Sequence, residues 1–238
     1  MKILVSIISL IAFLLVALPA PLHKFGFLDL GTAMTGFRFG LFVGIAALVL
    51  LAIQVIFKRK TVSLASAAIA VIFSAIAIAL PLGMMNNAKS VPPIHDISTD
   101  LVNPPEFVAI VPLRADASNP VEYAGAETAE QQRTAYPDLQ TLTYSQSKPE
   151  LIEAAKQTME NLGWELVNTD ADKGIIEATD TTTWFGFKDD VVVRVTDNGG
   201  ERLVDIRSKS RIGRSDMGKN AARIHGFIDE LNSVIEPS

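Results

Sequence analysis

Three long apolar runs dominate the first part of the chain. They cover residues 3–18, 39–57 and 62–85. A helix rises about 1.5 Å per residue, so each run approaches the ~30 Å needed to cross the hydrocarbon core of a bilayer. We therefore predict a membrane unit over residues 1–85 and a separate polar domain over residues 86–238. The three predicted membrane helices cover about residues 3–20, 39–57 and 62–84.

Basic residues near the ends of these runs predict the orientation. Lys58, Arg59 and Lys60 lie together in the short loop between the second and third runs. The positive-inside rule places such a loop in the cytoplasm. The third helix then leads out of the cytoplasm, so the polar domain is expected in the periplasm of a bacterial inner membrane. Lys24, Arg38 and Lys89 lie near the opposite ends and weaken the asymmetry.

The first apolar run has a second interpretation. After Met1 and Lys2 it also resembles the apolar part of a signal peptide. The sequence Leu-Pro-Ala-Pro at 18–21 lacks a small residue at the outer recognition position and places Pro after the bond, so an uncut helix is favoured. Cleavage would leave two crossings and the polar domain on the same side.

A stripe of small residues marks the second apolar run. Gly36, Gly40 and Gly44 recur at every fourth position, which lets helix backbones approach closely. The stripe fits packing within the unit, or a homodimer or another membrane protein as partner. None of the apolar runs contains a charged residue, so a transport path through the bilayer is not favoured.

The polar domain is predicted to be α+β. Ser147 and Glu150 form a capping-box pattern before a helical repeat that ends at Gly163. The period then changes to two, which predicts strands at 164–168, 175–184, 190–196 and 202–210. A final helix is expected from Ser215 or Asp216. The short turns predict a four-stranded antiparallel meander with two helices packed on one face.

The earlier part of this domain is less regular. Two Pro-Pro pairs interrupt residues 86–146, so we expect extended segments packed against the sheet. Residues 127–132 are expected to form one helical turn at most.

Charge and composition narrow the function. Residues 85–238 carry fifteen Lys or Arg against twenty-five Asp or Glu, a net charge of −10. Such an acidic domain is not expected to bind nucleic acid. The chain has no cysteine, which excludes disulfides, thiolate nucleophiles and cysteine metal sites. We expect no cofactor.

One end of the predicted sheet carries polar residues where apolar ones are expected. Ser208 and Ser210 share the phase of the core residues Val204 and Ile206, and Asp180 does the same in the strand from residue 175. In the preceding part of the last strand, Leu203, Asp205 and Arg207 are expected to face solvent. The polar end is therefore either a hydrogen-bonded structural network or a cleft.

Directly after this strand, a basic loop leads into the final helix. Free N–H groups at a helix N-terminus favour an anion such as phosphate or carboxylate. Alternatively, Ser215 or Asp216 caps the helix and the arginines pair with Asp180, Asp189 or Asp190. The predicted anion site comprises Arg211, Arg214, Ser215, Asp216, Ser210 and Asp180.

Catalysis has less support in the sequence. His95 and Asp96 could join Ser98 or Ser210 as base and nucleophile, but no Gly-x-Ser-x-Gly elbow is present. A metal site at His95, Asp96 and Asp100 is weaker still. We therefore predict no catalytic residue and no metal site.

An aromatic pair, Trp184-Phe185, lies beside Gly186. It is expected either in the core or at a hairpin tip that rests on lipid or a partner.

Three separated segments in the polar half resemble one known family. Residues 93–100, 179–190 and 207–218 are similar to the signature of the domain of unknown function 1499. The resemblance spans about residues 93–235 and extends to membrane-tethered bacterial members with N-terminal helices. It implies no established reaction or cofactor.

Together these features predict an uncharacterised inner-membrane protein with a periplasmic, non-catalytic binding or interaction domain. An accessory subunit in envelope maintenance would fit. The alternative is a small-ligand or lipid-acting enzyme that uses the polar end of the sheet.

Overall fold

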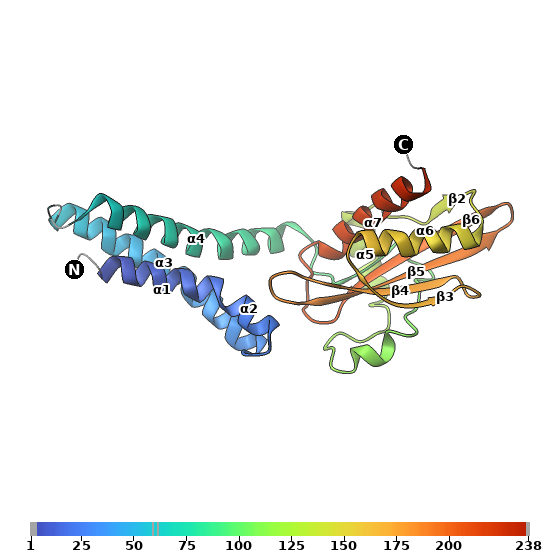
Figure 1. Cartoon of the computed structure of the whole chain (residues 1–238), viewed down its shortest axis with the longest axis horizontal. Coiled ribbons are helices and arrows are strands. Elements are labelled where there is room, and N and C mark those ends of the chain that lie inside the picture. The colour runs from blue at the N-terminus through green and yellow to red at the C-terminus, as the bar shows by residue number, and fades with distance from the viewer. Residues whose placement is uncertain (1–3, 59, 61, 237–238) are drawn as a thin grey trace. The chain divides into compact units, whose positions relative to one another are not determined.

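A computed structural model describes residues 4–58, 60 and 62–236 of the chain. The chain divides into two compact units (Figure 1). The first, here called the helical unit, extends to Lys89 and also includes Thr183–Gly186. The second, the sheet domain, comprises Ser90–Thr182 and the chain from Phe187 onward.

Four helices make up most of the helical unit. They are α1 (Leu4–Ala17), α2 (Pro19–Lys24), α3 (Leu30–Lys58) and α4 (Leu64–Ser90). Together they give three stretches that are long and apolar enough to cross a membrane, with α1 and α2 forming one of them. The prediction of three membrane helices is thereby supported, and the second and third are longer than expected. Lys2 and Arg59, on which the orientation argument partly rests, lie outside the described residues.

The glycine stripe packs within the chain. A methyl group at Gly40 would collide with the side chain of Val16 and lie 3.0 Å from the carbonyl oxygen of Ala12, both on α1. Gly44 faces α4, where the added carbon would lie 3.2 Å from the Cβ of Ala77. The small residues therefore allow close helix contacts inside this unit.

The helical unit also contains the aromatic pair. The ring of Phe37 on α3 lies 5.8 Å from that of Trp184 and 6.4 Å from that of Phe185, in edge-on arrangements. The Nζ of Lys24 donates to the carbonyl oxygen of Thr183 at 3.0 Å. Phe185 is buried, whereas Trp184 is 36% exposed.

The sheet domain is built on a six-stranded antiparallel sheet. The strands are β1 (Asp96–Ser98), β2 (Leu142–Tyr144), β3 (Glu165–Asp170), β4 (Ile175–Thr181), β5 (Lys188–Asn198) and β6 (Glu201–Ser210). Their order is β1-β6-β5-β4-β3, and β2 also pairs with β6. The predicted meander is present as β3 to β6, but the expectation of four strands is wrong. The two additional strands contain only three residues each, too few to show a period.

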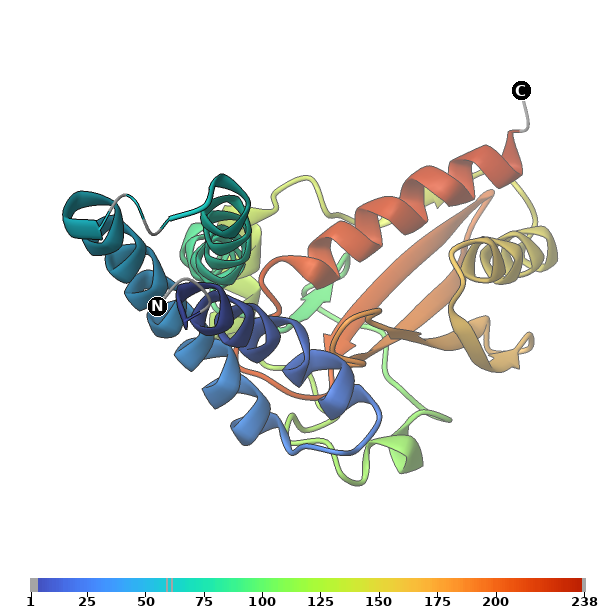
Figure 2. The same ribbon diagram turned by 60° about the vertical axis from the view of Figure 1, so that its left-hand side comes forward.

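Two helices cover one face of this sheet (Figure 2). They are α6 (Lys148–Asn161) and α7 (Lys219–Ile235). Their apolar side chains form the main core with those of the strands, including Ile152, Met159, Ile224 and Phe227. The capping box is confirmed, because the backbone N–H of Ser147 donates to the Glu150 carboxylate at 2.8 Å. The two-helix prediction holds for this face.

A further helix, α5 (Ala126–Ala135), corrects the expectation of a single turn. The carboxamide of Gln132 is buried and bonds to both backbone groups of Ser98 on β1. This tertiary contact holds α5 against the sheet edge, and it cannot be read from the local sequence.

The segment between β1 and α5 covers the opposite face. It contains a short 3-10 helix, η2 (Val111–Arg114), and an apolar cluster in which Phe107 and Ile110 pack on Val192. The carboxylate of Glu177 on β4 accepts the N–H groups of Val108, Ala109 and Ile110. Both faces of the sheet are therefore buried. The prediction that Asp205 and Arg207 face solvent is wrong, because this segment covers them.

Candidate functional site

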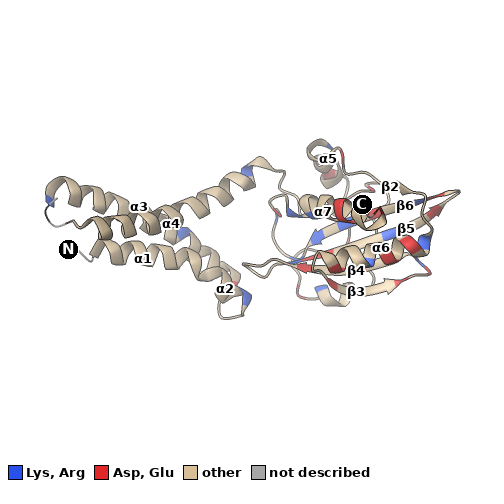
Figure 3. Cartoon of the chain, turned by 45° about the horizontal axis from the view of Figure 1, so that its top comes forward, with Lys and Arg blue, Asp and Glu red and all other residues tan. Residues whose placement is uncertain are grey.

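Charged residues are concentrated in the sheet domain, whereas the helices of the first unit are largely without them (Figure 3).

Three of the six predicted site residues lie around the first turns of α7. Asn220 donates to the hydroxyl of Ser210 at 3.0 Å and accepts from the hydroxyl of Ser208 at 2.7 Å. Arg223, one turn later, donates to Asp180 at 2.7 Å. The polar phase predicted for Ser208, Ser210 and Asp180 thus corresponds to a network beneath α7.

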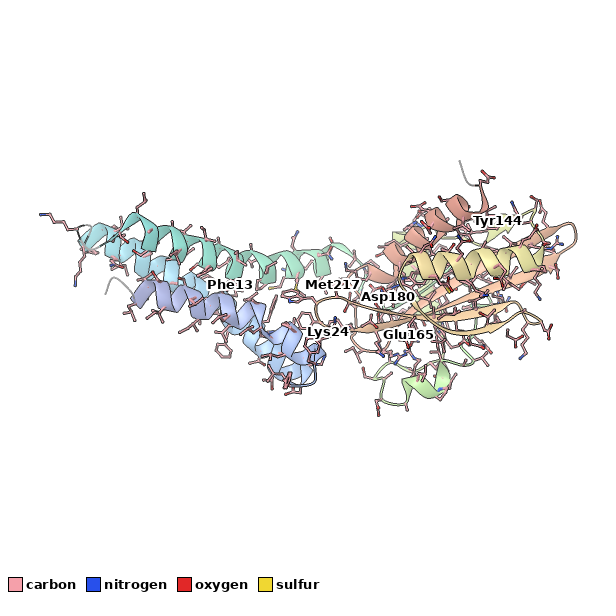
Figure 4. All side chains as sticks on the ribbon, in the orientation of Figure 1. Phe13, Lys24, Tyr144, Glu165, Asp180 and Met217 are labelled. Carbon is pink, nitrogen blue, oxygen red and sulfur yellow. The ribbon has the colours of Figure 1, made fainter. Side chains whose placement is uncertain are left out.

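Arg223 joins two carboxylates in this network. Its guanidinium binds Asp180, whose side chain is 29% exposed, and Asp189 at 2.6 Å, whose side chain is 5% exposed. Asp180 lies at the end of its strand, where Figure 4 labels it. Arg223 was not among the site residues predicted from the sequence. The available signal for Arg223 was its spacing from Asn220. The two residues lie one turn apart on the face of the helix that is turned to the polar strand ends.

Asp216 occupies the position expected for an external anion. Its carboxylate accepts the backbone N–H groups of Gly218 and Asn220, each at 2.8 Å. The helix begins at Lys219, later than predicted, because Met217 and Gly218 adopt positive φ angles of 56° and 80°. Burial raises the pKa of the Asp216 carboxyl, and the two backbone N–H groups oppose this shift. The free N–H groups of the helix start are therefore satisfied largely by the chain itself.

Arg211 points to the other face of the sheet. Its guanidinium binds the buried carboxylate of Asp190 through Nε at 2.9 Å and through Nη2 at 2.8 Å. Arg114 binds the same carboxylate at 2.5 Å. Asp190 is fully buried, so this pairing removes Arg211 from the group around α7 and matches the self-paired alternative.

Arg214 and Ser215 lie in the loop before α7. The side chain of Arg214 is exposed and forms no ion pair with any described residue. The hydroxyl of Ser215 accepts the N–H of Met217 at 3.2 Å. The structure thus gathers Ser210, Asp180 and Asp216 near the start of α7, whereas Arg211 binds Asp190 on the other face and Arg214 forms no ion pair with them. An anion site formed by all six residues remains a prediction.

A second charged cluster lies on the other face and was missed by the sequence argument. Asp96 on β1 is completely buried and binds Arg207 at 2.9 Å and Lys209 at 2.9 Å, both on β6. The Arg207 guanidinium also lies over the rings of Phe107, at 4.9 Å, and Tyr123, at 5.4 Å. Burial lowers the pKa of Lys209, while Asp96 favours its charged form. Charged residues alternate along β6, and the strand that pairs with it is buried. This pattern was the available signal that the second face of the sheet is covered.

The side chains of the candidate catalytic residues bind groups outside the predicted catalytic set. Asp96 binds Arg207 and Lys209, and the hydroxyl of Ser98 donates to the carbonyl oxygen of Asp100 at 2.9 Å. The Nδ1 of His95 lies 3.3 Å from the carbonyl oxygen of Arg214. Within the described part of the chain, no three His, Asp or Glu side chains gather in a way that could hold a metal ion.

A cavity of about 720 Å³ opens on this second face. Residues 102–104, 106–108 and 121–123 form one wall, and Ile175, Arg194 and Arg207 of the strands form the other. Its lining includes apolar side chains such as Phe107 together with the acidic residues Glu106 and Glu122. A volume of this order suits a small molecule.

The sheet domain matches a known family model. The model, described as a protein of unknown function (DUF1499), covers residues 96–231, from the first residue of β1 into α7. The chain belongs to this family. No curated protein matches the chain. The DUF1499 region includes both charged clusters and all the residues that line the cavity, and the helices up to Ser90 precede it.

Proposed function

We propose that this DUF1499 protein is an inner-membrane protein whose periplasmic sheet domain is a non-catalytic binding module. One observation carries the proposal: the buried ionic groups are neutralised within the domain, whereas an open cavity has a mixed polar and apolar lining. Asp96, Asp190 and Asp189 each have an arginine partner within 2.9 Å. Groups engaged in this way serve as a scaffold for a site rather than as reagents.

The charged clusters also favour a single rigid arrangement of the cavity wall. Removing one partner of a buried pair leaves an uncompensated charge, which costs about 3–5 kcal/mol. Arg207 donates to the carbonyl oxygens of Pro105 and Val121, so it fixes both loop segments that line the cavity. A preformed wall of this kind supports binding without a large ordering cost.

The proposed location rests on the three apolar helices and on the basic loop at Lys58–Lys60. This loop favours the cytoplasm, which puts the chain beyond α4 in the periplasm. An accessory role in envelope maintenance is compatible with such a location.

Purification from the native host in lipid nanodiscs, followed by mass spectrometry, tests the binding function. The proposal predicts a compound or protein that is retained by the parent and lost from Val121→Trp, which places a bulky side chain in the cavity lining. Melting temperatures of the two proteins serve as the control for folding. Equal retained material in both would contradict a binding function of the cavity.

A second candidate, an enzyme at the polar end of the sheet, is favoured by the raised pKa of the partly exposed Asp216 carboxyl. It predicts chemical conversion of the retained compound during incubation. It also predicts that Asp216→Asn binds the compound but leaves it unchanged. Recovery of the unchanged compound after incubation with the parent protein would exclude this candidate.

A further inference from the structure

We infer that the cavity on the second face binds a small organic cation with an apolar body, such as an aromatic amine. This inference rests on the proposed binding function and specifies its ligand. The cavity, with its volume of about 720 Å³, lies within the range of small-molecule sites. Its lining does not include the six residues of the predicted anion site.

The two arginines of the lining are already neutralised. Arg207 makes two hydrogen bonds to the Asp96 carboxylate, at 2.9 and 3.0 Å. Arg194 lies 3.0 Å from Asp100 and 2.8 Å from Asp205. Arg207 shares Asp96 with Lys209. The basic side chains of Arg207, Lys209 and Arg194 are thus balanced by the carboxylates of Asp96, Asp100 and Asp205, which leaves no net positive charge for an anionic ligand.

The two acidic residues of the lining are not neutralised. Glu106 and Glu122 are exposed, and neither carboxylate has an ion pair or hydrogen bond among the described residues. The backbone oxygen of Glu122 accepts a hydrogen bond from Lys209, which positions this residue at the cavity without using its carboxylate. The opening therefore has an excess of negative charge, which favours a cation.

The remaining lining favours an apolar body on that cation. Phe107, Val121 and Ile175 belong to one apolar cluster and also line the cavity. Val108 and Val102 at the same cavity are 55% and 84% exposed, and a ligand would remove this surface from water.

Tyr123 provides a second polar feature of the lining. Its hydroxyl is buried and has no hydrogen-bond partner among the described residues. Burial raises its pKa to about 12, with a further contribution from Asp96, so it remains a neutral donor.

Three probes with the same aromatic body test the inference. Full-length protein in nanodiscs is titrated with tryptamine, with its neutral alcohol analogue tryptophol, and with anionic indole-3-propionate, using isothermal titration calorimetry. We expect saturable binding of tryptamine, weaker binding of tryptophol and no binding of the propionate. Higher salt should weaken tryptamine binding, since the two carboxylates are exposed.

Variants then assign the charge preference to the cavity. Glu106→Gln combined with Glu122→Gln should weaken tryptamine binding about tenfold while leaving tryptophol unchanged. Glu165→Gln is the matched control, because Glu165 is an exposed acidic residue of β3 outside the lining (Figure 4). It should bind tryptamine as the parent does.

Two results would overturn the inference: no tryptamine binding to the parent, or equal binding by the double variant. Either would leave the binding function itself standing, provided that Val121→Trp still loses the compound retained from the native host. Loss of both findings would remove the binding function as well.

Discussion

At the scale of single residues, the sheet domain is organised by buried charges with specific partners. Asp96, Asp190 and Asp189 each accept from an arginine, and Glu177 accepts from three backbone N–H groups. Arg211 pairs with a carboxylate of its own domain, which was one of the two alternatives predicted from the sequence. The sequence alone does not identify Asp190 as this partner. The register of β5 against β6 determines which carboxylate lies beside Arg211.

Arg223→Met should destabilise the sheet domain strongly. The change leaves Asp189 buried without its cation and removes hydrogen bonds to Asp180 and Ser208. We expect the free energy of unfolding to fall by roughly 3 kcal/mol. Denaturant titration of the full-length protein, followed by far-UV circular dichroism, measures the loss.

Arg214→Gln provides the matched control for that prediction. Its guanidinium is exposed and has no ion-pair partner among the described residues. The free energy of unfolding should change by no more than about 0.5 kcal/mol. A strongly destabilised Arg214→Gln beside an unaffected Arg223→Met would contradict the assigned network.

Tyr123 should make stability fall in alkaline solution. Its folded-state pKa is raised to about 12 by burial and by Asp96, against about 10 in an unfolded chain. The folded protein keeps this proton between these two values while the unfolded chain loses it, so the free energy of unfolding decreases as pH rises. Tyr123→Phe should reduce this decrease and leave stability at neutral pH unchanged or higher, because the hydroxyl has no partner.

Titration of tyrosinate absorbance, together with denaturant unfolding at each pH, measures both effects. The parent should show a transition near pH 12 that is missing from Tyr123→Phe. An alkaline profile unchanged by the substitution would show that Tyr123 is not the responsible group.

At the scale of elements, periodicity predicted the long strands and helices of the sheet domain and missed its short strands. Strands β3 to β6 and helices α6 and α7 span enough residues to show their period, and all were expected. Strands β1 and β2, with three residues each, become strands by pairing with β6. Helix α5 forms against the sheet edge through Gln132, a contact that only the tertiary structure provides.

Gly40→Ala should disturb the packing of α1 on α3. The added methyl would collide with Val16 and lie 3.0 Å from the carbonyl oxygen of Ala12, so the two helices must separate. We expect a loss of about 1–3 kcal/mol, the usual cost of overpacking. Unfolding in mixed micelles with increasing SDS, monitored by circular dichroism, measures it.

Gly83→Ala on α4 is the control, because nothing lies within 4 Å of an added methyl there. It should be neutral or slightly stabilising, since alanine favours a helix more than glycine does. Equal behaviour of the two variants would contradict close packing at Gly40.

At the scale of the whole molecule, the sequence predicted the long apolar helices and the mixed helix and strand content better than the arrangement of the site. Runs of apolar residues directly indicate the helices that are long and apolar enough to cross a membrane. The site depends on which side chains share a face and on what covers it. Residues 99–125 have no regular period, so the covered second face and its cavity could not be predicted.

Cysteine labelling tests most directly whether the proposed binding domain lies outside the cytoplasm. The natural chain has no cysteine, so single cysteines can be introduced at Ser233, exposed on α7, and at Ser63, exposed before α4. A membrane-impermeant maleimide is applied to intact spheroplasts, with lysed spheroplasts as the control for reactivity. The account predicts that the cysteine at 233 reacts in intact spheroplasts and the one at 63 reacts only after lysis. Labelling of position 63 alone in intact spheroplasts would contradict it.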